Sequence, residues 1–240
     1  FRNRPNSVVL VGNHERKHQN KILSYAQEIV KVQFGDEYPN FINWLDTLNY
    51  YYETEEAIII HAFFEHDKSL ANQKQEVLCG STSGDRYLEK KYPTEKYWTE
   101  FYNGTKPIIY GHHVVGDQPK ILNNTYGIDT GACHGNYLTA IELPCFIIHQ
   151  VKAKKDYWKE EQKLWQIPVL KAKNWNEMQF EEIDKQLNKL SYIEDIEIVS
   201  YLSEIRKWKE ELQNSYSIIK DGITHFTNEL IQKEPTNFGA

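Results

Sequence analysis

The stretch that decides the fold of this 240-residue chain reads Val8-Val9-Leu10-Val11-Gly12-Asn13-His14-Glu15. The apolar run predicts a buried strand, and Gly12 permits the sharp turn that follows it. The polar side chains of Asn13 and His14 then stand at the carboxyl end of that strand, where open sheets bind ligands. The alternative is a loop in which Asn13 caps a helix that begins near Glu15.

Two later apolar runs end in the same way. The run 57–62 reaches His61, and the run 107–110 is followed by Gly111-His112-His113. A lone histidine at a strand end is more often a core residue, but three polar strand ends of one design favour a shared site. Neutral imidazoles and an amide oxygen suit a divalent transition metal such as Mn, Fe or Zn.

A fourth polar strand end follows residues 126–128, where Asp129 leads into Thr130-Gly131-Ala132. The carboxylate of Asp129 could orient a metal-bound histidine from behind. Its ordinary role would be to fix a turn through its own backbone. The residues alone leave both readings open.

The chain divides by pattern into residues 1–151 and 152–240. The first part alternates strand-like runs with helical stretches at 21–32 and 41–48, which predicts an α/β or α+β layered domain. Its other expected strands are 138–143 and 145–151. The second part carries apolar residues at helical spacing in three segments, 178–190, 196–212 and 219–230. We expect a helical extension that packs on the core or dimerises.

Composition narrows the function classes. The net charge is −6, so the chain gains no general attraction to nucleic acid or anionic lipid. No apolar run reaches the roughly 18 residues of a membrane span. Three cysteines cannot all pair within one chain, which favours a reducing compartment and a cytoplasmic location.

The ordered set of motifs resembles the calcineurin-like metallophosphoesterases. It consists of Gly12-Asn13-His14-Glu15, the strand-end His61, Gly111-His112-His113, and Asp129-Thr130-Gly131-Ala132 followed by Leu138-Thr139-Ala140. The resemblance covers about residues 7–151. The branch that looks most similar is the bacterial serine/threonine phosphatase and symmetrical diadenosine-tetraphosphatase group.

The resemblance implies a four-layer αββα sandwich with a two-metal site at the sheet edges. Asn13, His61 and His112 match the ligands of the second metal, and His14 matches the general acid that protonates the leaving alkoxide. A metal-bridging hydroxide would attack phosphorus in line. Arg86 and His113 are the candidates for contacting substrate, although a surface ion pair is the simpler role for Arg86.

One departure from the family concerns the first metal. The motifs G-D-x-H and G-D-x-x-D-R-G, which supply its ligands in the family, do not occur in residues 1–240, and position 1 is Phe. We therefore expect an N-terminal part of the domain to be missing, the first-metal ligands to lie upstream of residue 1, and this segment alone to have little activity.

The leading hypothesis from the sequence is a metal-dependent hydrolase of phosphate monoesters, with phosphoserine or phosphothreonine protein as substrate. An alternative enzyme hydrolyses dinucleoside polyphosphates, for which Phe63 and Phe64 at the pocket mouth could stack on a base. A third hypothesis is a non-catalytic binding module that retains the fold. Oligomerisation through the C-terminal helices is possible under each of them.

Overall fold

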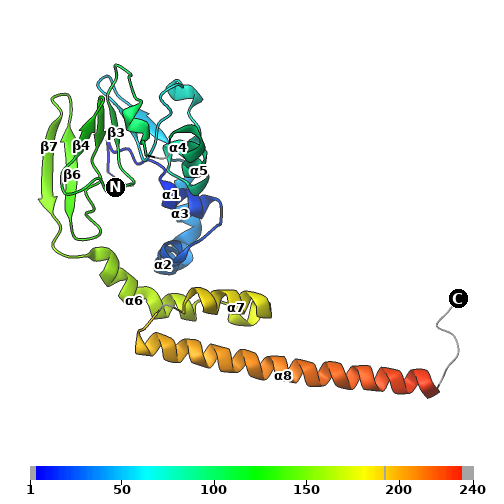
Figure 1. Cartoon of the computed structure of the whole chain (residues 1–240). Coiled ribbons are helices and arrows are strands. Elements are labelled where there is room, and N and C mark those ends of the chain that lie inside the picture. Colours follow the sequence, from blue (N-terminus) through cyan, green and yellow to red (C-terminus); the bar gives the residue numbers. More distant parts are fainter. Residues whose placement is uncertain (1–3, 94, 192, 234–240) are drawn as a thin grey trace, which may run out of the picture. The chain divides into compact units, whose positions relative to one another are not determined.

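The computed structural model describes residues 4–93, 95–191 and 193–233, and Figure 1 labels its helices and strands. It forms two compact units, Phe1–Val169 and Leu170–Ala240. The sequence analysis placed the domain boundary after residue 151. Strand β7 (Ile147–Lys152) ends there, but helix α6 (Tyr157–Lys171) lies mostly in the first unit. A domain division at residue 151 therefore stays a prediction.

A five-stranded sheet carries the first unit, in the order β1-β2-β3-β5-β4. Its strands are β1 (Tyr51–Glu53), β2 (Ile58–Ile60), β3 (Ile108–Tyr110), β4 (Lys120–Leu122) and β5 (Thr125–Gly127). The three central strands, β2, β3 and β5, run parallel, with Ile58 opposite Ile108 and Ile108 opposite Thr125. Because parallel strands end at the same edge, the residues that follow these three strands gather at that edge.

A second, two-stranded sheet pairs β6 (Tyr137–Glu142) with β7 in antiparallel fashion. In Figure 1 the five-stranded sheet lies between this hairpin and a group of helices. The helices of the first unit before α6 are α1 (Asn13–Gln19), α2 (Tyr25–Phe34), α3 (Tyr38–Leu45), α4 (Gln75–Leu78) and α5 (Thr82–Lys91). Short 3₁₀ turns lie at Gly35–Glu37, Leu70–Asn72 and Trp98–Glu100.

The core of the first unit sits between the central strands and helices α4 and α5. Ile60, Phe63, Trp98, Ile108 and Tyr110 are each at most 3% exposed. The rings of Trp98 and Tyr110 meet edge to face with centroids 5.1 Å apart, a favoured aromatic geometry. This packing fixes the strands whose ends carry the polar residues.

The sequence located most strands of the first unit. Residues 8–11 are the exception, because Leu10 forms only an isolated parallel bridge with Asn49. The edge strands β1 and β4 were not predicted, since their exposed, mixed sequences Tyr-Tyr-Glu and Lys-Ile-Leu carry no buried apolar run. Helix α6 was also not expected.

The second unit is helical. It contains α7 (Phe180–Lys189), α8 (Ile196–Lys233) and a 3₁₀ turn at Trp175–Glu177. Its small core includes Ile183, Leu187, Ile198 and Leu202, each 1–3% exposed. The two segments expected at 196–212 and 219–230 form one continuous helix of 38 residues, because residues 213–218 between them contain no glycine or proline to break it.

These elements confirm the mixed α/β class and the helical C-terminal extension. Along the part of the chain that the structure describes, no helix combines the length and the apolar character needed to cross a lipid bilayer.

Candidate functional site

The polar ends of β2 and β3 lie beside each other, as the sequence predicted. His61 follows β2 and His112 follows β3. The backbone N–H of Gly111 donates to the carbonyl of His61 over 3.0 Å, which continues the parallel ladder by one step. The two imidazole rings are therefore neighbours, with centroids 5.3 Å apart and planes inclined at 65°.

Asn13 joins this pair from a different element. It is the first residue of α1, directly after the N-cap Gly12. The alternative of a helix at this point is therefore confirmed, with Gly12 as its N-cap, and Asn13 and His14 lie in its first turn. The amide oxygen Oδ1 of Asn13 lies 3.2 Å from Nε2 of His61. Two donors bonded to one metal at about 2.1 Å lie roughly 3.0–3.4 Å apart. The spacing of Asn13 and His61 thus fits a shared ion.

Two glycines make room for the imidazoles. A Cβ atom on Gly12 would stand 2.9 Å from Nδ1 of His61. A Cβ atom on Gly80 would stand 2.9 Å from Nε2 of His112, and Gly80 also has a φ of +67°. Any larger residue at either position would push a ring out of place.

The surroundings keep both histidines neutral. Burial lowers the pKa of His61, against the opposing charge of Glu15. Burial, helped by the neighbouring His61 and His113, lowers the pKa of His112 to about 4. A neutral imidazole has a free lone pair, which is the form that binds a metal.

Three side chains supply part of the ligand set that one divalent transition metal needs. Asn13, His61 and His112 supply an amide oxygen and two imidazole nitrogens, a combination suited to Mn, Fe or Zn. Among the described residues, no group of three or more His, Cys, Asp and Glu side chains is arranged to hold a metal. Two of the three donors in the Asn13 set are histidines, and the third is an amide oxygen.

His14 is held by a residue that the sequence analysis did not single out. Nδ1 of His14 lies 2.6 Å from the amide nitrogen Nε2 of Gln27, a residue of α2 that is only 1% exposed. The amide oxygen of Gln27 accepts the backbone N–H of Ser24 over 3.2 Å. The amide nitrogen of Gln27 therefore donates to Nδ1 of His14, and a neutral His14 carries its proton on Nε2.

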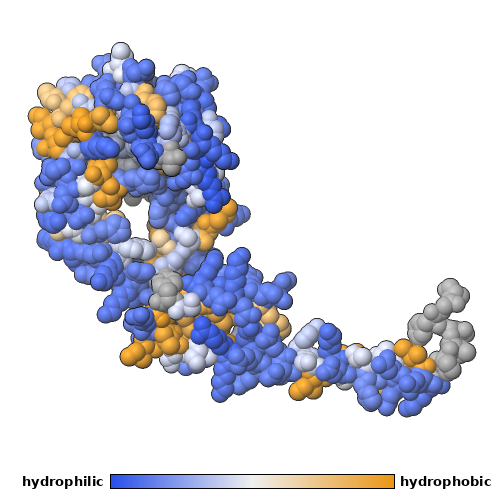
Figure 2. Space-filling view, viewed as in Figure 1, coloured by the Kyte–Doolittle hydropathy of each residue, from blue (hydrophilic) through white to orange (hydrophobic). Residues whose placement is uncertain are grey.

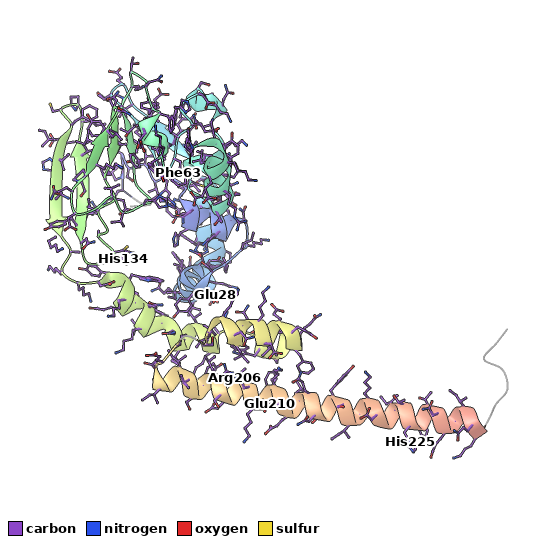
Figure 3. The ribbon with its side chains drawn as sticks, in the orientation of Figure 1. Glu28, Phe63, His134, Arg206, Glu210 and His225 are labelled. Carbon is purple, nitrogen blue, oxygen red and sulfur yellow. The ribbon has the colours of Figure 1, made fainter. Side chains whose placement is uncertain are left out.

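Beside His14 lies a cavity of about 510 Å³ in the first unit. Its walls include the rings of Tyr157 and Trp158, at the start of α6. His134, labelled in Figure 3, and Cys133 also line it, from the loop between β5 and β6. The cavity is thus aromatic on one side and opens next to a polar, proton-carrying side chain.

Asp129 follows β5 at the same sheet edge. It lines a groove of about 530 Å³ together with His61, Gly111 and His112. Its carboxylate oxygen Oδ1 accepts the backbone N–H of Gly131 over 3.0 Å. The turn-fixing role is therefore observed, and a role behind a metal-bound histidine stays a prediction.

The two candidate substrate contacts differ in placement. His113 is next to the site: its ring centroid is 4.5 Å from that of His112, and its Nδ1 is 3.4 Å from the hydroxyl of Tyr97. Arg86 is an exposed residue of α5. Within the described residues, no hydrogen bond or ion pair joins Arg86 to the histidines of the site.

Neither Phe63 nor Phe64 lines the groove that holds His61 and His112, contrary to the expectation from the sequence, and Phe63 lines a separate pocket with Tyr97 and Trp98. They are 1% and 4% exposed and belong to the core. Phe63 stands against His112 (Figure 3 labels Phe63), and Phe64 packs edge to face on Tyr102. The Phe-Phe pair comes after β2, His61 and Ala62, and its burial leaves neither ring an exposed face on which a base could stack.

The sequence contained signals for some of the residues that were missed. Ser24-x-x-Gln27 is the pattern of a capping box, and it forms at the start of α2. That pattern places Gln27 on the first turn of the helix. Gly80 stood in a Gly/Ser-rich stretch, but only the tertiary structure brings it against His112.

The sequence is similar to several bacterial enzymes. Bis(5'-nucleosyl)-tetraphosphatase PrpE (asymmetrical) of Anoxybacillus flavithermus is 38% identical over 90 residues, which are 36% of this chain and 36% of that protein. The protein of the same name from Bacillus thuringiensis is 30% identical over 124 residues, 50% of this chain and 48% of that protein. No protein-family model matches the sequence.

A solved structure of a candidate diadenosine tetraphosphatase overlaps 61% of this chain and 68% of its own, with a TM-score of 0.45 and 15% identity. The chain matches between 36% and 48% of the length of the two bacterial relatives.

Proposed function

We propose that this protein is a metal-dependent phosphoric ester hydrolase of the calcineurin-like metallophosphoesterase superfamily, and that it acts on dinucleoside polyphosphates. The observation that carries this proposal is the meeting of Asn13, His61 and His112 at one sheet edge, with His14 directly after Asn13. The names of the two relatives support the nucleotide substrate.

We assign Asn13, His61 and His112 to one of two divalent ions, with Mn, Fe and Zn as the metals that suit the donors. When bound, such a pair of ions supplies an attacking hydroxide and stabilises negative charge on the phosphoryl oxygens. The residues of this chain hold the donors in place: β2 and β3 fix the two histidines, and α1 fixes Asn13.

His14 is proposed as the general acid. Gln27 occupies Nδ1 of His14, so the proton available for transfer stands on Nε2. Protonation of the leaving oxygen by a positioned imidazole contributes about 10²–10⁴-fold to such reactions. His113 is proposed to contact the substrate from beside His112, and Asp129 to support the same edge. Arg86 is a weaker candidate for binding phosphate, since it lies apart on α5.

The cavity beside His14 favours a nucleotide over a phosphoprotein. Aromatic rings such as those of Tyr157 and Trp158 stack on nucleobases, and the volume of about 510 Å³ lies in the range of small-molecule sites. A serine/threonine phosphatase needs an open groove for a peptide, and neither of the two relatives is named as a protein phosphatase. Phosphoprotein is therefore the competing substrate class. A cytoplasmic location is proposed on the three free cysteines.

The proposal is tested on the longest polypeptide that the reading frame around this chain encodes. Release of phosphate or nucleotide from diadenosine tetraphosphate is compared with release of phosphate from a phosphoserine peptide, with Mn²⁺ present. We expect faster turnover of the dinucleotide. Faster turnover of the peptide would support the serine/threonine phosphatase hypothesis instead. If neither substrate is hydrolysed, the result would favour a non-catalytic binding module.

Two kinds of variant separate the proposed roles. His61→Ala and His112→Ala should lower the metal content measured by elemental analysis. His14→Asn should retain the metal and lower turnover by about 100-fold or more. Full activity of His14→Asn would refute its assignment as the acid.

A further inference from the structure

Residues 212–230 of α8 carry an uncovered apolar stripe. Six large side chains, each 44–62% exposed, lie in one row there, and they are Leu212, Tyr216, Ile219, Ile223, Phe226 and Leu230. In Figure 2 this helix shows separate hydrophobic patches on a mainly hydrophilic surface. Single exposed apolar residues are ordinary, but a continuous row on one helix marks an interaction surface. We call these six residues the apolar stripe.

The spacing of the apolar stripe is that of a coiled coil. Its members follow one another at intervals of 4, 3, 4, 3 and 4 residues. This repeat of 3.5 residues is the a/d pattern that keeps one seam facing a partner helix. In that pattern Tyr216, Ile223 and Leu230 take the a positions, and Leu212, Ile219 and Phe226 take the d positions.

The unit's own helices cover only the start of this seam. Ile198 and Leu202 continue the same heptad toward the N-terminus and are 3% exposed, and α7 packs against α8. Lys209 pairs with Asp184 of α7 over 2.5 Å. With ten residues, α7 is about 15 Å long, whereas α8 with 38 residues is about 57 Å long. The cover therefore ends near Leu212.

We propose that the apolar stripe pairs with the same stripe of a second copy of this chain, as a parallel two-stranded coiled coil. Each layer then joins two identical apolar side chains. Six such side chains expose roughly 600 Å² per chain, or about 1,200 Å² for two, against the roughly 1,000 Å² that a specific interface needs. A symmetric pair closes on itself.

Charge supports this occupant. Between residues 210 and 233 lie four acidic and two basic residues, so an anionic membrane surface would be repelled rather than attracted. In a parallel pair, Lys220 stands beside Ser215 of the partner subunit. In an antiparallel pair centred on the stripe, Lys220 would face Lys220 of the partner subunit, which like charges disfavour.

The test uses two adjacent isoleucines that differ only in their face. Ile219 lies in the apolar stripe and is 62% exposed, whereas Ile218 lies outside it and is 72% exposed. Sedimentation equilibrium of the full chain should give about twice the mass of 28.4 kDa. Ile219→Lys should weaken dimerisation by about 100-fold or more, because a lysine would be buried in the seam. Ile218→Lys should leave the dimer intact.

Both variants should retain the helical circular dichroism of the wild type at high concentration. A wild type that stays monomeric at tens of micromolar, or an equal effect of the two substitutions, would overturn the proposal. Orientation is tested with Ile223→Cys in a background in which Cys133 and Cys145 are serine. A parallel pair brings the two new thiols together and yields a disulfide-linked dimer, whereas Thr224→Cys, off the seam, should not. A dimer in which Ile223→Cys fails to cross-link would exclude the parallel arrangement.

Discussion

The phenyl ring of Phe63 stands edge-on to the imidazole of His112, with centroids 5.3 Å apart and planes at 85°. Phe63 is 1% exposed, so one edge of the candidate metal site is formed directly by the hydrophobic core. The orientation of His112 therefore depends on core packing as well as on its strand. Such supporting contacts set how well a ligand is placed before an ion arrives.

We expect Phe63→Leu to weaken metal binding. Leucine retains most of the volume, so the chain should fold, but the flat edge against His112 is lost and the ring gains freedom. Residues behind metal ligands typically contribute 10- to 100-fold in affinity, and we expect about 10-fold here. Titration with Mn²⁺ followed by calorimetry measures it. Phe64→Leu, which alters the neighbouring core position facing Tyr102, is the matched control and should bind metal normally.

Gly80→Ala should also displace the imidazole ring of His112. The new methyl group would stand 2.9 Å from Nε2 of His112, in addition to the strain of a φ of +67°. Gly35 has a φ of +50° but nothing within 4 Å of the position of its missing Cβ. Gly35→Ala therefore carries the backbone strain without the clash.

Comparison of these two glycine variants separates strain from obstruction. Gly35→Ala should lose about 1–2 kcal/mol in the free energy of unfolding, measured with urea. Gly80→Ala should lose more, because its methyl group would also stand 2.7 Å from Cβ of Ala62. Only Gly80→Ala should also lose metal affinity. Equal metal affinities in the two variants would mean that the ring of His112 moves aside without consequence.

The stability of the first unit should fall in acid through Glu65. This carboxylate is fully buried and accepts Lys91 over 2.9 Å, Lys68 over 3.0 Å and the hydroxyl of Tyr87 over 2.8 Å. Lys91 also pairs with Asp67. Burial alone would raise the pKa of Glu65, but the hydrogen bonds from Lys91, Tyr87 and Lys68 outweigh it and lower the pKa below its ordinary value of 4.5.

A lowered carboxyl pKa stabilises the fold above the unfolded value and loses that contribution as the pH falls through the folded value. The difference in unfolding free energy between wild type and Glu65→Gln should therefore be largest above about pH 5 and shrink toward pH 3. At pH 7 we expect a loss of about 2–4 kcal/mol. Urea unfolding at several pH values gives the curve, and a difference independent of pH would contradict the role of the charge.

Trp158→Ala should act on nucleotide substrates alone if its ring stacks on a base. Stacking on an aromatic side chain contributes about 1–3 kcal/mol, so KM for diadenosine tetraphosphate should rise roughly 10-fold. Hydrolysis of glycerol phosphate, which has no base, should be unchanged. Trp165→Ala on the same helix is the control, since Trp165 does not line the cavity beside His14.

Much of the site could be predicted because each of its parts is local in sequence. An apolar run that ends in Gly, Asn or His identifies both the strand and the residue at its end, as at His61 and His112. The helical extension was equally visible from its apolar spacing. These features depend on periodicity, which a single sequence displays directly.

The remaining parts depend on contacts between distant segments. Gln27 meets His14 only because α2 folds back on α1, and Gly80 meets His112 only once α4 and β3 have come together. The burial of Phe63 likewise follows from α5 and Tyr97 closing over it. Residue type alone does not distinguish a phenylalanine at the mouth of the site from one buried in the core.

The three proposed ligands also lie far apart along the chain. Asn13 and His61 are separated by 48 residues. His112 comes later still, after β3. Contacts between distant segments form slowly relative to a helix or a hairpin, so we expect the donors to converge only after β2 and β3 have paired. An ion would thus bind the finished sheet and raise its melting temperature by mass action, without serving as a nucleus around which the chain folds.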